Sequence, residues 1–409
     1  MLGLARSGRA ATIALRERGV EVTAFDRSAD VDVADIEATG ARVALGADDL
    51  ALLTGVDLVV KSPGIPGDVP LVVGARERGI PIISEIELGF RLLENPMLGI
   101  TGTNGKTTTT SLLGAIFAAA GVPAEVAGNI GRPLTSLAGT VPAGTWIVCE
   151  LSSFQLEDVE TLRPRVAVLL NLEADHIDRH GSLDAYRAAK LRVFERQQAE
   201  DVAVLPRGFG PIPGAARRVE FAWDDPLPAE PRIRGAHNRE NAVAATAAAR
   251  AAGIAADAIV EALRTFPGVA HRIEEVGEVA GVRYVNDSKA TNVAAALRAL
   301  ASFPEARLHV LLGGLGKNES FAPLAAAFKP GDRAYLIGAA QAEIAASLDR
   351  AGVDYVLCED LRSALAEAAR TAAATDVVLL SPACASFDQF QSYEHRGEEF
   401  GRLVQKLHG

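Results

Sequence analysis

Apolar and polar residues alternate along the 409-residue chain in blocks that predict strands separated by helices. Short apolar runs between glycine or polar residues are typical of buried strands, whereas apolar residues three or four positions apart indicate amphipathic helices. A short strand is expected from residue 97, and further strands are expected at 20–26, 57–60, 80–83, 146–149, 166–170, 282–286, 308–312, 334–338 and 377–380. This alternation predicts an α/β protein with parallel sheets.

Two interruptions divide the pattern into three predicted domains. The first follows residue 93, at Glu94-Asn95-Pro96, and the second lies at Pro267-Gly268. We therefore expect domains over residues 1–93, 94–267 and 268–409. The first and last are expected to be Rossmann-like, and the middle one to have the parallel sheet of a P-loop ATPase. The proline-rich residues 206–231 are predicted to form an irregular surface excursion.

The first residues predict half of a nucleotide-binding α/β unit. A glycine turn from Gly3 to Gly8 precedes an amphipathic helix to about Gly19, and the following strand ends at Asp26. Such a turn normally follows a buried strand, but only two residues precede Gly3. We therefore expect this domain to lack its first strand, which would leave backbone groups beside Gly3 unpaired.

Composition narrows the possible partners and the compartment. The net charge of -11 disfavours a nucleic acid or an anionic membrane surface as the main partner. Cys149, Cys358 and Cys384 lack the spacing of a zinc site or a disulfide framework, which fits a reducing cytoplasm. The apolar run at residues 112–122 is too short to span a bilayer. We therefore expect a cytoplasmic protein without membrane insertion.

A glycine-rich loop at residues 98–108 is the sharpest local signal. A strand leads into Gly102, Gly105 and Lys106, and a helix follows. Glycines let backbone N–H groups approach phosphates, and the lysine can reach the terminal phosphates while Thr107 binds magnesium. The alternative is a glycine turn that only caps a helix. We expect ATP to contact Gly102, Thr103, Asn104, Gly105, Lys106, Thr107 and Thr108.

A second candidate for the metal site is Glu150. It ends the apolar strand that begins at Trp146. Carboxyl ends of parallel strands converge on the ligand crevice, so this carboxylate is expected to bind magnesium. A helix cap or a surface charge is the alternative for an isolated glutamate at a strand end.

Several motifs together resemble those of the Mur ligase family. They follow one another in the order typical of that family, and the resemblance covers essentially the whole chain: residues 101–108, 150–155, 171–178, 186–190, 237–241, 271–272, 286–292 and 380–386. The resemblance implies a monomer in which a first, UDP-binding domain precedes the ATP-binding and amino-acid-binding domains. The implied reaction joins D-glutamate to UDP-N-acetylmuramoyl-L-alanine with ATP.

The resemblance also implies an unusual second metal site. Lys190 matches a lysine that family members carbamylate, and His176 matches its partner ligand, so two magnesium ions are expected. An unmodified lysine would repel magnesium, whereas a carbamate carries the opposite charge. The alternative is a solvated helix lysine. The implied metal ligands are Thr107, Glu150, His176 and Lys190.

The remaining site residues follow from the same resemblance. Catalytic roles are implied for Lys106, His176, Lys190, Lys289 and Lys317. Further ATP contacts are implied for Asn241, Arg272 and Asp287. The UDP site is expected at Ala5, Arg6, Asp26, Arg27 and Gly64, the muramoyl contacts at Asn129 and Ser152, and the D-glutamate site at Thr291, Ser386, Phe387 and Tyr393.

The implied chemistry is activation of a carboxylate as an acyl phosphate, followed by attack of an amine. We expect the third domain to close over the second at a hinge near Pro267, which would exclude water. Three alternatives remain open at this point. They are another Mur ligase or a folylpolyglutamate synthetase, a dinucleotide-dependent oxidoreductase, and a nucleotide-binding protein without catalysis.

Overall fold

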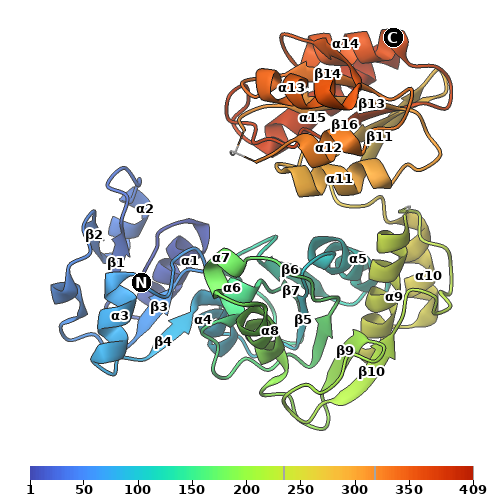
Figure 1. The fold of residues 1–409 in the computed structure, drawn as a ribbon. Coiled ribbons are helices and arrows are strands. Elements are labelled where there is room, and N and C mark those ends of the chain that lie inside the picture. The colour runs from blue at the N-terminus through green and yellow to red at the C-terminus, as the bar shows by residue number, and fades with distance from the viewer. Residues whose placement is uncertain (234, 317–318, 409) are drawn as a thin grey trace. The chain divides into compact units, whose positions relative to one another are not determined.

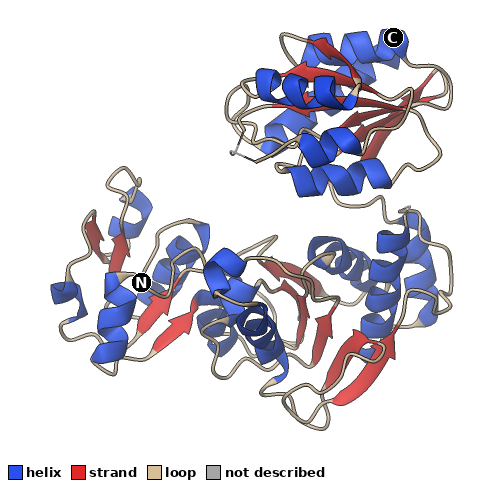
Figure 2. Cartoon of the chain, viewed as in Figure 1, coloured by secondary structure: helices blue, strands red, loops and turns tan. Residues whose placement is uncertain are grey.

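The computed structural model describes residues 1–233, 235–316 and 319–408, and Figures 1 and 2 show its helices and strands. The chain divides into two compact units. The first holds Met1–Arg232 and Ala236–Phe266, and the second holds Ile233–Gly235 and Pro267–Gly409. The first two predicted domains therefore share one compact unit, and the division into three domains stays a prediction.

The first region of the chain is a small α/β layer. Its parallel strand pairs are β1 (Thr23–Asp26) with β2 (Arg42–Leu45), and β3 (Val59–Lys61) with β4 (Ile82–Ser84). Its helices are α1 (Arg6–Glu17), α2 (Ala34–Glu37), η1 (Leu50–Leu53), α3 (Pro70–Glu77) and α4 (Glu85–Arg91).

The first residues of the chain join these two strand pairs. Leu2 forms parallel bridges to both Phe25 and Lys61. The Leu2 amide donates to the carbonyl of Val60 at 2.8 Å, and the Gly3 amide donates to the carbonyl of Phe25 at 2.8 Å. The prediction of unpaired backbone groups beside Gly3 was therefore wrong, because these few residues occupy the position between β1 and β3.

A buried carboxylate fastens the first region to the central one. Glu87 on α4 accepts hydrogen bonds from the backbone amides of Glu160, Thr161 and Leu162, at 2.9–3.0 Å. Burial alone would raise the pKa of Glu87, but hydrogen bonds from the Thr161 hydroxyl, from the backbone amides and from Arg91 bring it below its usual value. Glu87 is fully buried. The two regions are therefore joined by a buried carboxylate whose hydrogen bonds are made, in addition to apolar contacts.

The central region contains a parallel sheet of six strands among the described residues, in the order β10-β9-β8-β5-β7-β6. The strands are β5 (Met97–Thr101), β6 (Ala124–Gly128), β7 (Trp146–Glu150), β8 (Val166–Leu169), β9 (Val202–Pro206) and β10 (Arg217–Phe221). The helices are α5 (Lys106–Ala119), η2 (Leu134–Leu137), α6 (Ser153–Leu156), α7 (Ile177–His180), α8 (Leu183–Leu191), η3 (Arg192–Phe194), α9 (Ala236–Ala251) and α10 (Ala256–Thr265).

Helices cover both faces of this central sheet. α5 packs against α9 and α10 on one face, as Figure 1 shows. The other face is buried under α4, η2, α6 and η3, where Leu151, Leu156 and Phe194 form part of one apolar core. β5 therefore lies in the interior of the sheet with all its residues buried, which fixes the position of the loop that follows it.

The prediction that residues 206–231 are wholly irregular was wrong. β10 lies inside that segment and pairs in parallel with β9. Its polar, largely exposed residues are those of an edge strand, so no apolar run marked it in the sequence.

The C-terminal region contains a second six-stranded sheet among its described residues, in the order β11-β12-β16-β13-β14-β15. The strands are β11 (Glu274–Val279), β12 (Val282–Asn286), β13 (Leu308–Gly313), β14 (Arg333–Ile337), β15 (Asp354–Leu357) and β16 (Val377–Leu380). The helices are α11 (Val293–Ala301), α12 (Ala322–Ala326), α13 (Gln341–Ala351), α14 (Leu361–Thr371), α15 (Tyr393–Gln405) and η4 (Lys406–His408). Separate apolar cores lie under α11–α13 and under α14–α15.

The prediction of a wholly parallel sheet in this region was wrong at one edge. β11 pairs antiparallel with β12. The turn between them consists of Ala280 and Gly281, whose φ angles of 52° and 79° are both positive. Such a two-residue turn matches the twist of a hairpin, so the strand reverses without a crossover helix.

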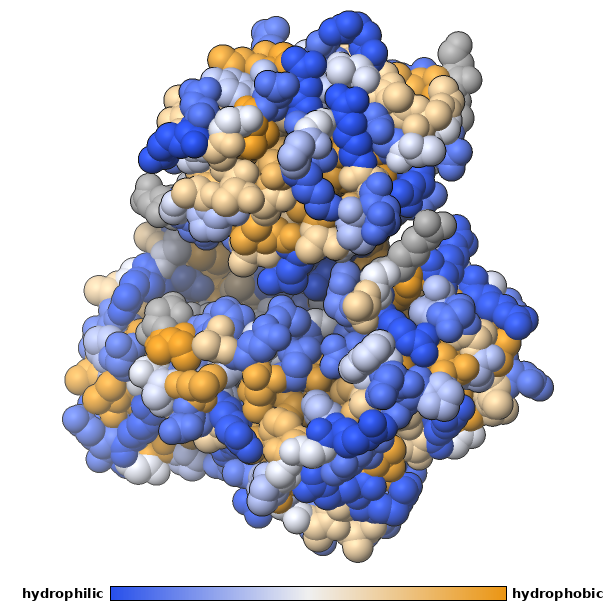
Figure 3. Space-filling view, turned by 45° about the vertical axis from the view of Figure 1, so that its right-hand side comes forward, coloured by the Kyte–Doolittle hydropathy of each residue, from blue (hydrophilic) through white to orange (hydrophobic). Residues whose placement is uncertain are grey.

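The molecular surface in view in Figure 3 carries hydrophobic residues in groups between hydrophilic ones. Among the described residues, each helix is too short or too polar to cross a membrane.

Candidate active site

The glycine loop after β5 leads directly into α5. Gly105 is the N-cap of this helix, with a φ of 82°, and a Cβ atom there would lie 2.1 Å from Oδ1 of Asn241. Only glycine fits both the left-handed backbone and this close approach. Asn241, on α9, is thereby placed against the predicted phosphate loop, and the first amides of α5 are oriented as in an anion site.

The loop is held by the segment after β8. The Asn104 amide donates to Oδ1 of Asn171 at 2.8 Å, and the Thr103 amide donates to the Asn171 carbonyl at 3.1 Å. The hydroxyl of Thr103 lies 2.9 Å from that of Tyr186. Sequence reasoning gave no role to Asn171 or Tyr186, although both stand in the motifs that carried the resemblance.

Two lysines converge on one carbonyl of the loop. Nζ of Lys106 donates to the Gly102 carbonyl at 2.8 Å, and Nζ of Lys190 donates to the same carbonyl at 2.7 Å. Lys190 is 1% exposed and lies 4.7 Å from the ring centre of Tyr186. Burial, together with the positive charge of Lys106, lowers the pKa of Lys190 to about 7. Its amine is therefore partly neutral near pH 7. The alternative of a solvated helix lysine does not fit a side chain that is buried.

Glu150 has the environment of a cation ligand. It is 1% exposed, and its Oε1 accepts a hydrogen bond from Nδ2 of Asn129 at 2.7 Å. Its other carboxylate oxygen is buried without a hydrogen-bond partner among the described residues. A buried, unsatisfied carboxylate oxygen is costly unless a cation or water completes it. Glu150 and the buried Thr107 therefore fit the predicted magnesium site.

Within the described residues, no three His, Cys, Asp or Glu side chains are grouped so that they could hold a metal ion by themselves. The predicted ligand set includes a threonine and a modified lysine, so it is of a different kind. Magnesium typically keeps several waters and phosphate oxygens in addition to one or two protein ligands.

His176 begins α7 in the left-handed conformation, with a φ of 52°. Its side chain is 47% exposed, and its ring lies 4.8 Å from that of Phe154 and 6.3 Å from that of Tyr186. His176 and Lys190 therefore both lie beside Tyr186. Sequence reasoning gave no role to His180, whose ring lies 5.3 Å from that of Tyr186 and whose Nε2 lies 3.0 Å from the Ser153 hydroxyl.

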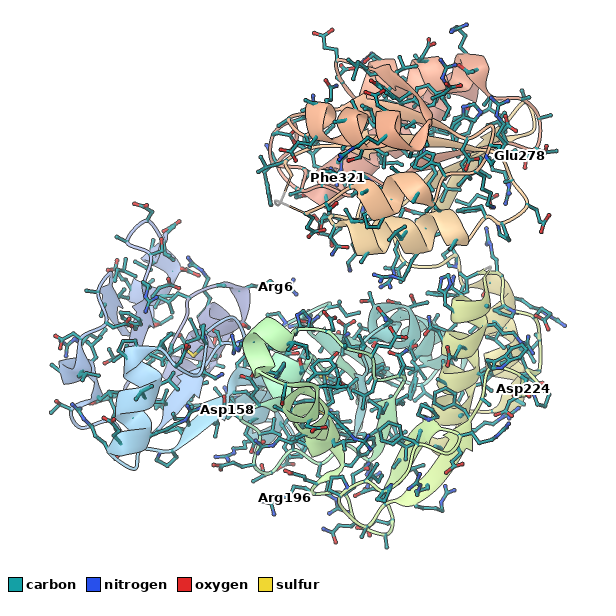
Figure 4. All side chains as sticks on the ribbon, viewed as in Figure 1. Arg6, Asp158, Arg196, Asp224, Glu278 and Phe321 are labelled. Carbon is teal, nitrogen blue, oxygen red and sulfur yellow. The ribbon has the colours of Figure 1, made fainter. Side chains whose placement is uncertain are left out.

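The predicted UDP residues gather at the start of α1. The Asp26 carboxylate accepts from the amides of Leu4 at 2.7 Å and Ser28 at 2.9 Å. Ala5 is the N-cap of α1, and the exposed Arg6 extends outward from that helix in Figure 4.

The other two predicted UDP residues lie in nearby loops. Arg27 forms an ion pair with Asp48. A Cβ atom at Gly64 would meet nothing within 4 Å, so this glycine faces open space.

The predicted muramoyl contacts lie beside Glu150. Asn129 is bonded to it, and Ser152 caps α6 in a reciprocal capping box with Gln155. Nε2 of Gln155 also donates to Glu85 at 3.0 Å. Burial raises the pKa of Glu85 to about 7, so a carboxyl group of the first region supports this segment.

The C-terminal unit gathers the other predicted contacts at the carboxyl end of β12. Asp287 accepts from the Ser381 hydroxyl at 2.7 Å and from the Ile273 amide at 3.2 Å, and burial raises its pKa to about 7. Arg272 lies next to Ile273 in the chain. The Lys289 amide donates to the carbonyl of His271 at 3.0 Å.

The predicted D-glutamate residues surround the same sheet edge. Nζ of Lys289 lies 5.9 Å from the ring centre of Tyr393, and the Thr291 amide donates to the Lys289 carbonyl at 2.9 Å. Ser386 is buried, whereas Phe387 is 70% exposed. Lys317 lies outside the described residues.

Sequence reasoning missed a buried arginine in this region. Arg396 is 1% exposed and donates to the hydroxyl and carbonyl of Ser288 at 2.9 Å each, and to the carbonyl of Cys384 at 3.2 Å. It thereby joins the loops after β12 and β16. Its place in a polar helix gave no signal of burial.

A glycine loop that leads into a helix, two converging lysines and a buried carboxylate define a nucleotide-dependent enzyme site. Residues 100–208 match the family model of the Mur ligase middle domain, and residues 271–384 match that of the Mur ligase glutamate ligase domain. The chain belongs to the Mur ligase family.

Within this family, the similar full-length proteins are UDP-N-acetylmuramoylalanine–D-glutamate ligases. The one from Acidobacterium capsulatum is 43% identical, with 99% of this chain and 95% of the relative covered. The one from Koribacter versatilis is 40% identical, with 100% and 97% covered.

Two solved structures share the fold. The UDP-N-acetylmuramate-alanine ligase of Thermotoga maritima is 19% identical, with a TM-score of 0.60 and coverage of 99% of this chain and 98% of that one. The bifunctional folylpolyglutamate synthase/dihydrofolate synthase of Yersinia pestis is 18% identical, with a TM-score of 0.56 and coverage of 80% and 92%.

Proposed function

We propose that this chain joins D-glutamate to UDP-N-acetylmuramoyl-L-alanine, with conversion of ATP to ADP and phosphate, in peptidoglycan precursor synthesis. The observation that carries the proposal is the full-length similarity, at 40% and 43% identity, to ligases named for that reaction. The geometry around Gly102 supports it, because Lys106 and the buried Lys190, two of the predicted catalytic residues, both donate to its carbonyl. We further propose three domains that bind UDP, ATP and the amino acid, and a monomer that acts in the cytoplasm.

The proposed reaction has two steps that conserve atoms and charge. An oxygen of the alanyl carboxylate attacks the γ-phosphorus of ATP, and ADP leaves with the electrons of the broken P–O bond. The amine of D-glutamate then attacks the acyl carbon, loses a proton, and expels phosphate as the amide forms.

The phosphate loop serves the first step. The amides at the start of α5, together with Thr107 and Thr108, bind the phosphates, and Lys106 turns from the carbonyls of Gly102 and Thr103 toward the γ-phosphate. Asn241, Arg272 and Asp287 would contact the nucleoside and its phosphates. Because both oxygens of Asp287 already accept hydrogen bonds, a ribose hydroxyl would have to share this carboxylate.

Lys190 acquires its proposed role by carbamylation. Its neutral amine attacks carbon dioxide, an N–C bond forms, and one proton leaves, so the cation becomes an anion. The pKa of about 7 makes the neutral amine available near neutral pH. Two bound magnesium ions would neutralise the charge between phosphate and carboxylate, with Thr107 and Glu150 at one ion and His176 and the carbamate at the other.

The remaining residues would bind and orient the two other substrates. Asn129 and Ser152 contact the muramoyl moiety, and the UDP moiety lies against Ala5, Arg6, Asp26, Arg27 and Gly64. D-glutamate would be held by Lys289, Thr291, Lys317, Ser386, Phe387 and Tyr393.

The decisive test is an assay of ADP release with magnesium and bicarbonate. We expect release only when ATP, UDP-N-acetylmuramoyl-L-alanine and D-glutamate are all present. L-Glutamate, UDP-N-acetylmuramate without alanine, and a folate acceptor are the matched controls. Release with the folate acceptor would identify a folylpolyglutamate synthetase, and ATP binding without release under any of these conditions would refute catalysis.

A further inference from the structure

We propose that Arg179 is a positioning residue that couples the loop of residues 62–65 to the ring of His176. This inference rests on the proposed function for its two ends, the UDP-sugar site at Gly64 and the metal ligand at His176. Binding of the UDP-sugar would then favour the metal-binding position of His176. Binding of the metal would in turn favour binding of the UDP-sugar.

One end of the coupling consists of hydrogen bonds to the loop. Nη2 of Arg179 donates to the carbonyl of Ile65 at 2.8 Å and to that of Pro63 at 3.4 Å. Nζ of Lys61 donates to the same Ile65 carbonyl at 3.3 Å. These carbonyls flank Gly64, which faces open space. The loop is therefore held from one side by cations and is free to meet a ligand from the other.

A cluster of ion pairs fixes the guanidinium in this position. Arg179 lies 3.0 Å from Oε2 of Glu157, which also lies 3.1 Å from Nζ of Lys61. Lys61 is 1% exposed and forms a second ion pair with Asp158 at 2.9 Å. Asp158, labelled in Figure 4, lies where the first region meets the central one. Glu157, paired with both Lys61 and Arg179, leaves the guanidinium few alternative positions.

The other end of the coupling is aromatic. Cζ of Arg179 lies 4.9 Å from the ring centre of Phe154, and the ring of His176 lies 4.8 Å from that same ring. Arg179 also belongs to α7, the short helix that His176 begins. A movement of the loop that shifts Arg179 would therefore reach His176 both through Phe154 and through the backbone of one helical turn.

Coupling between two sites is reciprocal, so it is measurable from either side. The first measurement is the Kd of UDP-N-acetylmuramoyl-L-alanine by calorimetry, with a non-hydrolysable ATP analogue, with and without saturating Mn²⁺. We expect Mn²⁺ to tighten binding to the unmutated protein about fivefold or more. The second is the affinity for Mn²⁺ by electron paramagnetic resonance, which the sugar nucleotide should raise by the same factor.

The test variant is R179M, which keeps an unbranched side chain but removes the guanidinium. The Kd ratio, which is the Kd for the sugar nucleotide without Mn²⁺ divided by that with Mn²⁺, should fall in this variant to between one and about two. The matched control is R76M. Arg76 also donates to a carbonyl of the first region, that of Gly67, and lies 4.0 Å from Asp158, but it makes no described contact with Phe154. R76M should therefore keep the full ratio.

A second variant guards against a simple loss of structure. F154L leaves the bonds of Arg179 to Pro63 and Ile65 in place but removes the ring between Arg179 and His176. It should lower the Kd ratio in part, because the backbone route through α7 remains. Both variants should keep the thermal midpoint within a few degrees and bind the sugar nucleotide without Mn²⁺. R179K should restore part of the ratio.

The outcomes separate this inference from the proposed function. A full ratio in folded R179M or F154L would overturn the coupling, as would a ratio of one in the unmutated protein that still releases ADP. Failure of the unmutated protein to bind UDP-N-acetylmuramoyl-L-alanine or to release ADP would instead overturn the proposed function.

Discussion

The central and C-terminal sheets have similar architectures but different chemistry at the carboxyl ends of their inner strands. β5 leads into a glycine loop whose last residue, Gly105, is the N-cap of α5. β13 ends at Gly313, and beyond Gly314 the backbone of Leu315 exchanges two hydrogen bonds with that of Ala385. The first arrangement leads into the N-terminus of a long helix, an end that favours an anion, whereas in the second the amides of Gly313, Gly314 and Leu315 donate to carbonyls within the protein. The segment after a strand therefore decides which sheet edge can bind phosphate.

Buried ionisable groups also differ between the two sheets. The central sheet buries Lys190 at its carboxyl edge. The C-terminal sheet buries His309 near the start of β13, where Nδ1 lies 2.8 Å from the Tyr335 hydroxyl and Nε2 lies 3.1 Å from Asp376. Lys190 lies where substrates would meet, whereas His309 lies at the opposite edge. The same kind of burial is thus expected to serve catalysis in one sheet and stability in the other.

The largest expected effect tests the catalytic side of this comparison. K190R preserves a cation that can donate to the Gly102 carbonyl but cannot form the proposed carbamate. We expect ADP release to fall about 1,000-fold, because an anion that organises the reaction is lost. Carbon-13 nuclear magnetic resonance with labelled bicarbonate should show a carbamate signal in the unmutated protein and none in the variant. An active K190R would show that Lys190 acts as a cation.

A smaller effect is expected at the glycine that begins α5. G105A places a methyl group against Asn241 and strains a left-handed residue, so we expect ATP affinity to fall about 100-fold, as measured by calorimetry. G121A is the matched control, since Gly121 also has a positive φ, of 64°, but its Cβ would meet nothing within 4 Å. Equal losses in the two variants would show that backbone strain, and not the loop, is responsible.

The C-terminal counterpart should change stability without changing turnover. H309F leaves Tyr335 and Asp376 without their buried partner, and we expect a loss of about 2 kcal/mol in the hydrogen-exchange stability of β13. ADP release at 25 °C should stay within about twofold. A large loss of turnover in a folded H309F protein would contradict the division of roles between the two edges.

The effect of H309F should also depend on pH. Burial lowers the pKa of His309 below its ordinary value of 6.5, although Asp376 opposes the shift. Below pH 6.5 the unfolded chain therefore binds more protons than the folded protein. The stability that the neutral His309 contributes is fully present above that pH and is lost as the pH falls. The difference between the two proteins should therefore narrow toward pH 5.

A last effect, confined to stability and to high pH, is expected at Glu85, where the first and central regions meet. E85Q keeps an acceptor for Gln155 but cannot ionise. Because the folded pKa is about 7 and the ordinary value is 4.5, ionisation of Glu85 opposes folding as pH rises through 7. E85Q should be up to about 3 kcal/mol more stable at pH 8 and equal near pH 4 in urea unfolding. A difference that is constant with pH would contradict a buried, protonated acid.

The sequence predicted best the features that depend on local pattern. The strands at Val282–Asn286 and Val377–Leu380 were predicted residue for residue, because apolar runs between turns mark buried strands clearly. β10 was missed because an edge strand has polar residues, and the antiparallel β11 was missed because its Ala280-Gly281 turn is a weak signal. Strand direction depends on such turns and on pairing across long sequence distances.

For the candidate site, motifs indicated which segments matter but not how they touch. The glycine loop was predicted from spacing, whereas the contact of Asn241 with Gly105 depends on the packing of α9 against α5. The low pKa of Lys190 depends on burial, and so does the lack of a hydrogen-bond partner for one carboxylate oxygen of Glu150. A motif does not encode burial. The roles of the site residues remain predictions that the variants above test.

The saturated carboxylate of Glu87 has a practical consequence for protein engineering. Since it accepts three backbone amides from residues 160–162, a chimera that replaced residues 1–93 with the corresponding part of another ligase would need an acid at the same point of its last helix. Without it, the recipient would carry three amides that have lost their acceptor, and graft junctions would be better placed before Glu85, which keeps the recipient's own Glu87, than after Arg91.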